Sequence, residues 1–172
     1  MKKILNKTSI NNKIAKIGEA ISEKYKGKNP IFIGILKGSF IFLADLLRSI
    51  EIDCEVEFIK VHSYEGVKST GNIKVISDIS TELKDRHIVL VEDIIDSGRT
   101  IRFLHKKFQN IPVKSISIAT FLMKPNSQNF DFNIDYIGFE IKQGFVVGYG
   151  LDYNQRYRNL NGLYLLENEI EF

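Results

Sequence analysis

Short apolar runs constrain the fold of this chain more than any other feature. The clearest are "IFIGIL" (31–36) and "HIVLV" (87–91), which are rich in β-branched residues. A strand with one face in water alternates apolar and polar residues, whereas a strand covered on both faces is apolar throughout. These two runs, together with "SISIATFL" (115–122), therefore predict strands at the centre of a covered sheet.

Helical patterns alternate with these strands. Helices are expected at "FIFLADLLRSI" (40–50) and along the face marked by Ile101, Leu104 and Phe108. An N-terminal helix is expected behind a cap at Thr8 or Ser9, and its apolar face comprises Ile10, Ile14, Ile17, Ile21 and Tyr25. Strands that alternate with helices predict an α/β fold with a mainly parallel twisted sheet flanked by helices.

Weaker strand patterns complete the chain. "CEVEFIKVHSY" (54–64) and "IKVIS" (73–77) predict strands on either side of a polar loop. The segments "YIGFE", "FVVGYG" and "LYLLE" predict short strands that form a hairpin or a small flanking element from the termini. Because no repeat, low-complexity tract or linker divides the sequence, we expect a single domain over residues 1–172.

The composition favours a soluble, cytoplasmic protein. The single cysteine, Cys54, cannot form an internal disulfide, which indicates a reducing compartment. The start of the chain lacks the apolar run of a signal peptide, and no apolar stretch is long enough to cross a membrane. The formal net charge of +3 suits an anionic ligand but is too small to predict binding of nucleic acid.

An acidic motif follows the second apolar run. In "VLVEDIIDSGRT" (89–100), Glu92, Asp93 and Asp96 lie so close together that they repel one another unless a cation, a sugar or a proton is bound there. The motif lies between strand 87–91 and a helix that begins near Thr100. Because ligands bind outside the carboxyl ends of parallel strands, the motif predicts a ligand site.

The second half of this motif is suited to a phosphate group. Gly98 allows close backbone approach, Ser97 and Thr100 offer hydroxyl groups, and the N-terminus of the following helix attracts anions. The acids can accept hydrogen bonds from a ribose diol and hold Mg²⁺, and Asp96 is placed to act as a general base or acid. The motif therefore predicts a sugar-phosphate site; the alternative is a capped turn with solvated acids.

The same motif resembles the phosphoribosyl diphosphate (PRPP) binding motif of type I phosphoribosyltransferases, in the form typical of the hypoxanthine-guanine branch. "ILKGSFIFLADLL" (35–47) looks like the diphosphate loop of that branch and the helix after it, and "HSYEGVKSTGNIKV" (62–75) looks like its mobile loop. "FLMKPN" (121–126) and "GFEIKQGFVVGYGLDYNQRYRNL" (138–160) resemble its purine-binding segments. All of these segments occur in the order found in the family.

This resemblance implies an activity. A similar protein transfers the 5-phosphoribosyl group from PRPP to hypoxanthine or guanine, gives IMP or GMP plus diphosphate, requires Mg²⁺, and serves purine salvage. Similar proteins are homodimers or homotetramers. Two alternatives stay open: an RNA-binding regulator built on the same fold, and an enzyme that uses xanthine or a pyrimidine. Neither a dense Lys/Arg stripe nor interleaved aromatic residues support the regulator.

The resemblance also implies residue roles. Glu92 and Asp93 would contact the ribose hydroxyls and the Mg²⁺ shell, and Asp96 would exchange a proton with the imidazole part of the purine. The 5′-phosphate would be bound by Ser97, Gly98, Arg99 and Thr100. Diphosphate would be bound by Lys37, Gly38 and Arg158, and the peptide bond before this lysine is often cis in similar proteins.

The purine would be bound by four further residues. Lys124 would donate to its exocyclic oxygen, which favours an oxo group over an amino group. Phe145 would stack on the base, the Val146 backbone would bind its edge, and Asp152 would face both the base and a second Mg²⁺.

Ser63 and Tyr64 begin the mobile loop, which would exclude water when closed. "KQG" (142–144) departs from the family pattern.

Overall fold

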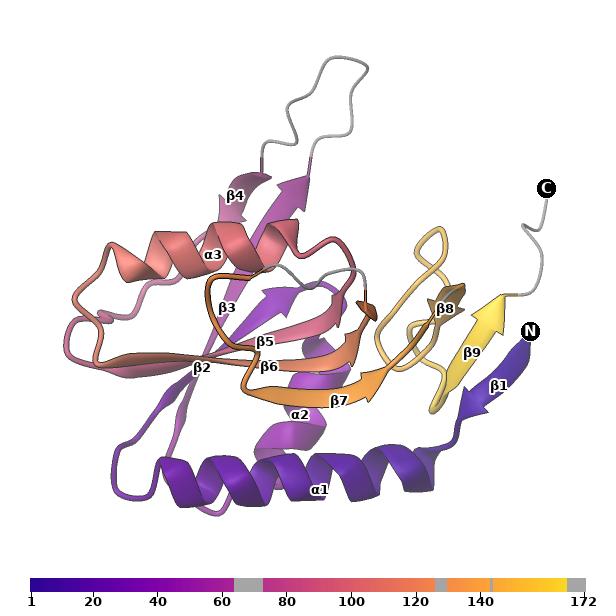
Figure 1. The fold of residues 1–172 in the computed structure, drawn as a ribbon, viewed down its shortest axis with the longest axis horizontal. Helices are drawn as coiled ribbons and strands as arrows, with labels where there is room; N and C mark the ends of the chain where they lie inside the picture. Colours follow the sequence, from indigo (N-terminus) through magenta and orange to yellow (C-terminus); the bar gives the residue numbers. More distant parts are fainter. Residues whose placement is uncertain (64–72, 126–129, 143, 167–172) are drawn as a thin grey trace.

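The computed structural model describes residues 1–63, 73–125, 130–142 and 144–166, and these form two sheets and three helices (Figure 1). The large sheet has the strand order β4-β3-β2-β5-β6-β7, and the small sheet has the order β1-β9-β8. All pairs in the large sheet are parallel except that of β3 with β4. The predicted α/β fold with a mainly parallel sheet is therefore confirmed.

The elements follow one another as a succession of strands and helices. Their bounds are β1 (Lys2–Leu5), α1 (Lys7–Lys24), β2 (Ile31–Leu36), α2 (Phe40–Arg48), β3 (Glu55–Ser63), β4 (Ile73–Ser77), β5 (His87–Ile95), α3 (Arg99–Gln109), β6 (Ser115–Met123), β7 (Tyr136–Glu140), β8 (Phe145–Val147) and β9 (Leu163–Leu166).

The central strands bury both of their faces, as their apolar sequences predict. In β5, Val89 and Val91 belong to the core that α1 and α2 cover, whereas Ile88 and Leu90 belong to the core that α3 covers. The same alternation of successive side chains occurs along β2. The layer of helices on each face is visible in Figure 1, where the sheet lies between α3 and α1.

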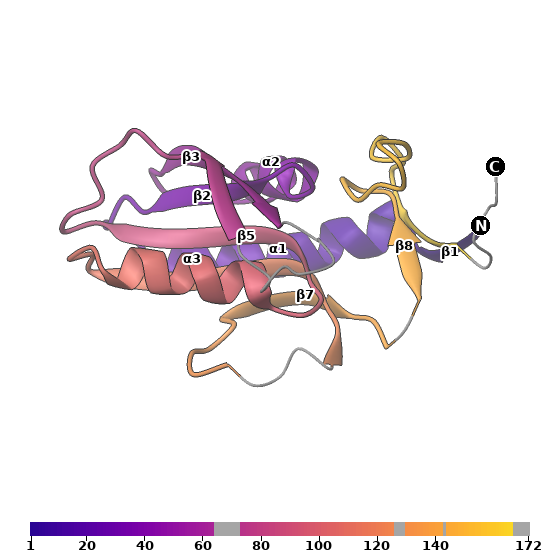
Figure 2. The ribbon, with the colours of Figure 1, turned by 90° about the horizontal axis from the view of Figure 1, so that it is seen from above.

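The small sheet forms from both ends of the described chain. Strand β1 pairs antiparallel with β9, which pairs antiparallel with β8. Figures 1 and 2 show this sheet at one end of the molecule, beyond the carboxyl ends of the large sheet's strands. The expected flanking element from the termini is therefore confirmed. No helix among the described residues is long and apolar enough to span a membrane.

Two sequence-based boundaries were wrong. Strand β5 does not end at residue 91 but continues to Ile95, because it keeps its parallel pairing with β6 beyond the apolar run. Helix α1 is capped neither by Thr8 nor by Ser9: its N-cap is Asn6, whose side chain accepts a hydrogen bond from the Ser9 N–H at 2.8 Å. Strand β1, with its two lysines, was not located, although a flanking element from the termini was expected.

The identity of this cap can be tested by substitution. Asn6→Ala removes the side-chain acceptor, so we expect it to lower the free energy of unfolding by about 1 kcal/mol. Thr8→Ala should cost nothing, because Thr8 lies inside the helix, where alanine is a better helix former than threonine. Urea unfolding of both variants checks this; a loss confined to Thr8→Ala would contradict the assignment.

Candidate active site

The acidic motif lies where β5 meets α3. Glu92 and Asp93 lie in the C-terminal half of β5, and Asp96 is the first residue after the strand. Glu92 is only 7% exposed and Asp93 is partly exposed, whereas the Asp96 side chain is 64% exposed. The three acids therefore occupy different environments, although they are close in sequence.

The carboxyl groups of Glu92 and Asp93 lie in an environment that disfavours their charged forms. Burial raises the pKa of Glu92 well above its usual range, and the neighbouring Asp93 raises it further. Burial also raises the pKa of Asp93, while the charge of Arg158 acts in the opposite direction. The Oε2 atom of Glu92 is buried and has no hydrogen-bond partner among the described residues. Such an orphaned acceptor is the kind of group that a ligand hydroxyl or a cation satisfies.

The turn after β5 has a geometry that suits an anion. Gly98 precedes α3 with a φ of +73°, a conformation that favours glycine, and it caps the helix without a side-chain hydrogen bond. The first N–H groups of a helix have no partner within the helix and attract anions. A cavity of about 100 Å³ lies at this turn, lined by Glu92, Ile94, Ile95, Asp96, Ser97, Gly98, Arg99, Thr100 and Ile101. The structure thus brings the predicted phosphate-binding residues together around one small cavity.

Two residues that sequence reasoning missed support this turn. Arg102 donates from Nη1 to the Ser97 carbonyl at 3.1 Å, and its guanidinium lies 4.4 Å from the centre of the Phe130 ring. Phe130 also closes the space beside Gly98, where an added Cβ would lie 2.5 Å from the ring. These contacts hold the turn in place. No local sequence pattern predicts them, because Phe130 is distant from the turn in sequence.

A lysine and an aspartate meet beside the turn after β5. Lys124 directly follows β6, and its backbone N–H donates to the Ile95 carbonyl at 3.0 Å. Its ammonium group forms an ion pair with Asp96, with 2.9 Å between Nζ and Oδ2. A carboxylate that can accept a proton and a group that only donates hydrogen bonds therefore lie side by side at the carboxyl edge of the sheet.

The turn after β2 lies against the acidic pair. The peptide bond between Leu36 and Lys37 is cis. Gly38 touches the Asp93 carboxylate so closely that an added Cβ would lie 1.5 Å from Oδ2. Ser39 is buried and donates to the Ile35 carbonyl at 2.7 Å, which closes the turn. Any side chain at position 38 would therefore displace either this turn or the carboxylate.

The segment between β8 and β9 supplies the remaining charged groups. Arg158 donates to the Gly150 carbonyl at 2.8 Å and pairs with Asp152 at 2.7 Å. The other carboxylate oxygen of Asp152 accepts the Gln155 N–H at 2.9 Å, and the Gln155 side chain accepts from Lys37 at 3.2 Å. Arg158 and Lys37, both expected to bind diphosphate, are thus linked through Gln155.

An exposed aromatic side chain lies on the small sheet. Phe145 begins β8 and is 53% exposed, with its ring edge-on to Tyr153 at a centroid distance of 5.6 Å. The next residue, Val146, is buried and anchors the strand in the core. An exposed ring on an anchored strand is free to stack on a flat ligand.

The acids fit a magnesium ion that is shared with a substrate. The described residues contain no group of three His, Cys, Asp or Glu side chains placed to hold a metal by themselves. Magnesium does not require such a group, because it commonly binds one or two carboxylates together with waters and substrate phosphates. Glu92, with its unpartnered oxygen, and Asp93 fit that description. Both oxygens of Asp152 are already engaged by Arg158 and Gln155.

Some predicted residues lie outside the described part of the chain. Tyr64 and Gln143 are not described, and Ser63 ends β3 with only its backbone described. The expectation that the 62–75 segment closes over the site therefore stays a prediction.

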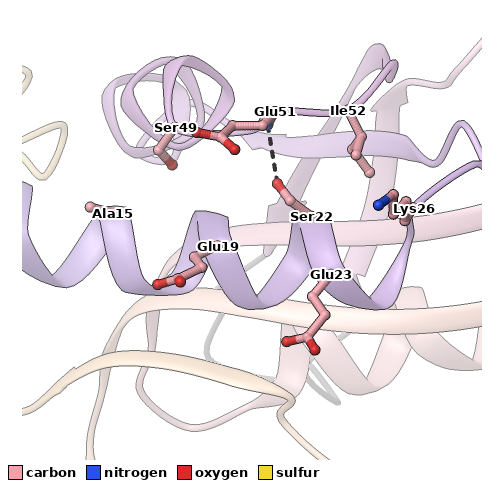
Figure 3. Close-up of a pocket in the computed structure, with 8 residues that line it drawn as sticks. All are labelled: Ala15, Glu19, Ser22, Glu23, Lys26, Ser49, Glu51 and Ile52. Atoms are coloured by element: carbon pink, nitrogen blue, oxygen red, sulfur yellow. Dashed lines mark hydrogen bonds between the residues drawn. The ribbon is translucent and has the colours of Figure 1, made fainter.

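A larger cavity occurs elsewhere, between α1 and the segment after α2 (Figure 3). Its volume is about 690 Å³, and its lining includes Glu19, Glu23, Lys26 and Glu51. Ser22 accepts the Glu51 N–H there at 3.1 Å. Because residues 49–52 lead into the amino end of β3, this cavity lies away from the carboxyl edge where the acidic motif is found.

Comparison with known proteins identifies a matching family and similar sequences. The profile of the phosphoribosyl transferase domain matches residues 1–154. The bifunctional protein TilS/HprT of Listeria monocytogenes is 39% identical over 170 residues, which cover 98% of this chain but only 26% of that protein. This chain thus spans about a quarter of that relative. The hypoxanthine-guanine phosphoribosyltransferase of Streptococcus pyogenes is 40% identical over 172 residues, covering 99% of this chain and 96% of the relative.

Solved structures agree with the sequence relatives. A hypoxanthine phosphoribosyltransferase from Staphylococcus aureus superposes with a TM-score of 0.91 and 35% identity, covering 96% of this chain and 91% of that one. The Trypanosoma cruzi enzyme in complex with the product IMP superposes with a TM-score of 0.90 and 33% identity, covering 99% and 96%. The fold, the family match and these relatives agree. This chain therefore belongs to the phosphoribosyltransferase family, in its hypoxanthine-guanine branch.

Proposed function

We propose that this chain transfers the 5-phosphoribosyl group from PRPP to hypoxanthine or guanine, releasing IMP or GMP and diphosphate. The observation that most supports the proposal is the Asp96–Lys124 ion pair at the cavity of the turn after β5. It combines a carboxylate that can accept a proton with an ammonium group that can donate a hydrogen bond to an oxo group. The names of the relatives support the purine substrates, and the IMP complex of the Trypanosoma cruzi enzyme supports the product. The reaction would serve purine salvage.

The proposed chemistry is a substitution at the anomeric carbon of the ribose. A nitrogen of the imidazole part of the purine forms the new bond to this carbon, and the bond to diphosphate breaks. Asp96 accepts the proton that the purine nitrogen loses, as a general base. Lys37, Gly38 and Arg158 bind the departing diphosphate, where a guanidinium suits clustered oxygens.

The proposed base specificity depends on Lys124. An ammonium group only donates hydrogen bonds, so it suits the exocyclic oxygen of hypoxanthine or guanine, which accepts them. The exocyclic amino group of adenine is itself a donor, so Lys124 cannot form this hydrogen bond with adenine. Phe145 would stack on the base, and the Val146 backbone would bind its edge. Xanthine carries the same exocyclic oxygen, so Lys124 does not exclude it.

We also infer that Mg²⁺ is required. Glu92 and Asp93 would hold it together with the ribose hydroxyls and the diphosphate, and Asp152 would join only by giving up a contact to Arg158 or Gln155. When bound, the ion would neutralise charge on the leaving group. A single domain over residues 1–172 in a reducing cytoplasm fits this function. Burial raises the pKa of the Cys54 thiol, which lowers the share of the reactive thiolate form.

We further infer that the chain forms a homodimer, alone or within a homotetramer, through one face of β3. Val56 and Phe58 point to the same side of this strand and are 41% and 43% exposed. Helix α2 lies beside them, since a Cβ added at Gly34 would contact both Leu43 and Phe58. Its first residue, Phe40, is also 43% exposed. We call Phe40, Val56 and Phe58 the β3 patch.

Charge complementarity favours a second copy of the chain on this patch. Glu51 and Asp53 precede the amino end of β3, whereas Lys60 and Lys74 lie toward its other end. A twofold axis through the middle of the strand would bring the acids of one copy to the lysines of the other, as an isologous contact requires.

The role of the general base can be tested with Asp96→Asn. Because asparagine cannot accept the proton, we expect the rate of IMP formation from PRPP and hypoxanthine to fall at least about a hundredfold. Asp85→Asn is the matched control, since Asp85 is an exposed acid in the turn before β5. Steady-state rates of both variants decide; retention of more than half the wild-type rate by Asp96→Asn would contradict the role.

The role of Lys124 predicts a change in base preference. Lys124→Gln removes a charge-assisted hydrogen bond to the oxo group, so we expect kcat/KM for hypoxanthine to fall about tenfold to a hundredfold. Glutamine also offers a carbonyl to an amino group, so the preference against adenine should narrow. The exposed Lys114→Gln serves as the control. An unchanged ratio of the two bases would rule out this source of specificity.

The β3 patch predicts a mutation that blocks self-association. Phe58→Glu places a charge in the middle of the proposed contact, so the variant should be monomeric when the wild type is dimeric or larger. Ile4→Glu is the control, because Ile4 is similarly exposed, at 38%, but lies on the small sheet. Light scattering after size-exclusion chromatography measures the mass. A monomeric wild type, or an unchanged Phe58→Glu, would exclude this contact.

A further inference from the structure

Tyr149 is a buried residue in an unusual backbone conformation. It lies in the segment between β8 and β9, is 4% exposed, and has its ring 4.7 Å from the ring of the core residue Phe121. Its φ is +50°, between Gly148 at +98° and Gly150 at +99°. A non-glycine residue with positive φ costs free energy and persists only when its surroundings hold it. The contacts of Tyr149 therefore need an explanation.

The hydroxyl group of Tyr149 makes one long-range hydrogen bond. It donates to Oδ2 of Asp45 on α2 at 2.7 Å, across 104 residues of sequence. The other oxygen of Asp45 pairs with Arg48, one turn further along the helix, at 2.7 Å. Burial and the hydrogen bond to Asp45 raise the pKa of the Tyr149 hydroxyl well above its usual range, so it remains a donor. Helix α2 and the segment after β8 are thus tied at one point.

The residues next to this hydrogen bond reach the proposed diphosphate site. Gly150 packs on the turn after β2, since a Cβ there would lie 2.1 Å from the Gly38 carbonyl oxygen. The Gly150 carbonyl accepts from Arg158 at 2.8 Å, and Gln155 links Arg158 to Lys37. Helix α2, which carries Asp45, begins two residues after Gly38. Both segments proposed to bind diphosphate are therefore adjacent to the Tyr149–Asp45 contact.

We propose that Tyr149 and Asp45 are positioning residues, whose hydrogen bond sets the spacing between the Lys37–Gly38 turn and Arg158 and thereby the affinity for the diphosphate group. Neither residue needs to touch the substrate for this role. The proposal rests on the proposed function and adds to it a determinant of PRPP and diphosphate binding outside the acidic motif. It differs from a purely structural role, which would lower stability without selecting one substrate.

The test compares variants by KM, kcat and direct binding. Tyr149→Phe keeps the ring and removes only the donor, so we expect KM for PRPP and the Kd for magnesium diphosphate to rise about fivefold to tenfold. The kcat and the KM for hypoxanthine should change less than twofold, because the base site and Asp96 are untouched. Titration calorimetry with magnesium diphosphate gives the Kd without any turnover.

Substitutions of Asp45 test the same hydrogen bond from its other side. Asp45→Asn keeps an acceptor for the tyrosine hydroxyl, so it should stay within about twofold of the wild-type KM for PRPP. Asp45→Ala removes the acceptor and should behave like Tyr149→Phe. The double variant Tyr149→Phe/Asp45→Ala should be no worse than either single variant, because both remove one shared interaction.

Tyr25→Phe is the matched structural control. Tyr25 is 1% exposed and donates to Ser117 Oγ at 2.7 Å, near the amino end of β6. The Tyr25→Phe variant should lower the melting temperature about as much as Tyr149→Phe does, and it should leave the KM for PRPP unchanged. If Tyr149→Phe lowers only the melting temperature, or changes kcat and both KM values alike, the positioning role is overturned while the proposed function stands. If the wild type neither binds PRPP nor forms IMP, both are overturned.

Discussion

The enclosure of two neighbouring carboxyl groups, Glu92 and Asp93, is the constraint on which the rest of the site depends. Their place near the end of β5, which lies between β2 and β6, buries Glu92 and part of Asp93, and desolvation disfavours the charged forms of both. Gly38 must lack a side chain because Asp93 occupies that space. On the proposed function, a substrate with vicinal hydroxyls and a bound cation would satisfy both acids.

The site is assembled from segments far apart in sequence because the sheet brings their ends together. The parallel strands β2, β5 and β6 end at one edge and deliver the Lys37–Gly38 turn, the acidic motif and Lys124. The small sheet, formed from both ends of the described chain, adds Phe145 and the segment that contains Arg158. The large sheet supplies the frame, while the contacts of the segment between β8 and β9 with α2 and with the turn after β2 set the distance between the groups that we propose bind diphosphate.

Local patterns in the sequence were enough to predict the strands other than β1 and the position of the acidic motif after a strand, because burial of strand faces and turn chemistry depend on neighbouring residues. They failed where the decisive contact is distant. The end of β5 was missed because acids interrupt its apolar run, although its pairing with β6 continues. Nothing near Tyr149 in the sequence indicates its hydrogen bond to Asp45. The role of Arg102 is equally hidden, because its sequence pattern is that of an ordinary helical residue and its partner Phe130 is distant in sequence.

The most direct test of this account is the product formed by the wild-type protein. Purified protein would be incubated with PRPP and Mg²⁺ and, in separate reactions, with hypoxanthine, guanine, xanthine or adenine, and the nucleotides identified by mass spectrometry. We predict IMP from hypoxanthine and GMP from guanine, no AMP, and no product once Mg²⁺ is chelated. Formation of AMP as readily as IMP, or no nucleotide from any base by folded protein that binds PRPP, would contradict it.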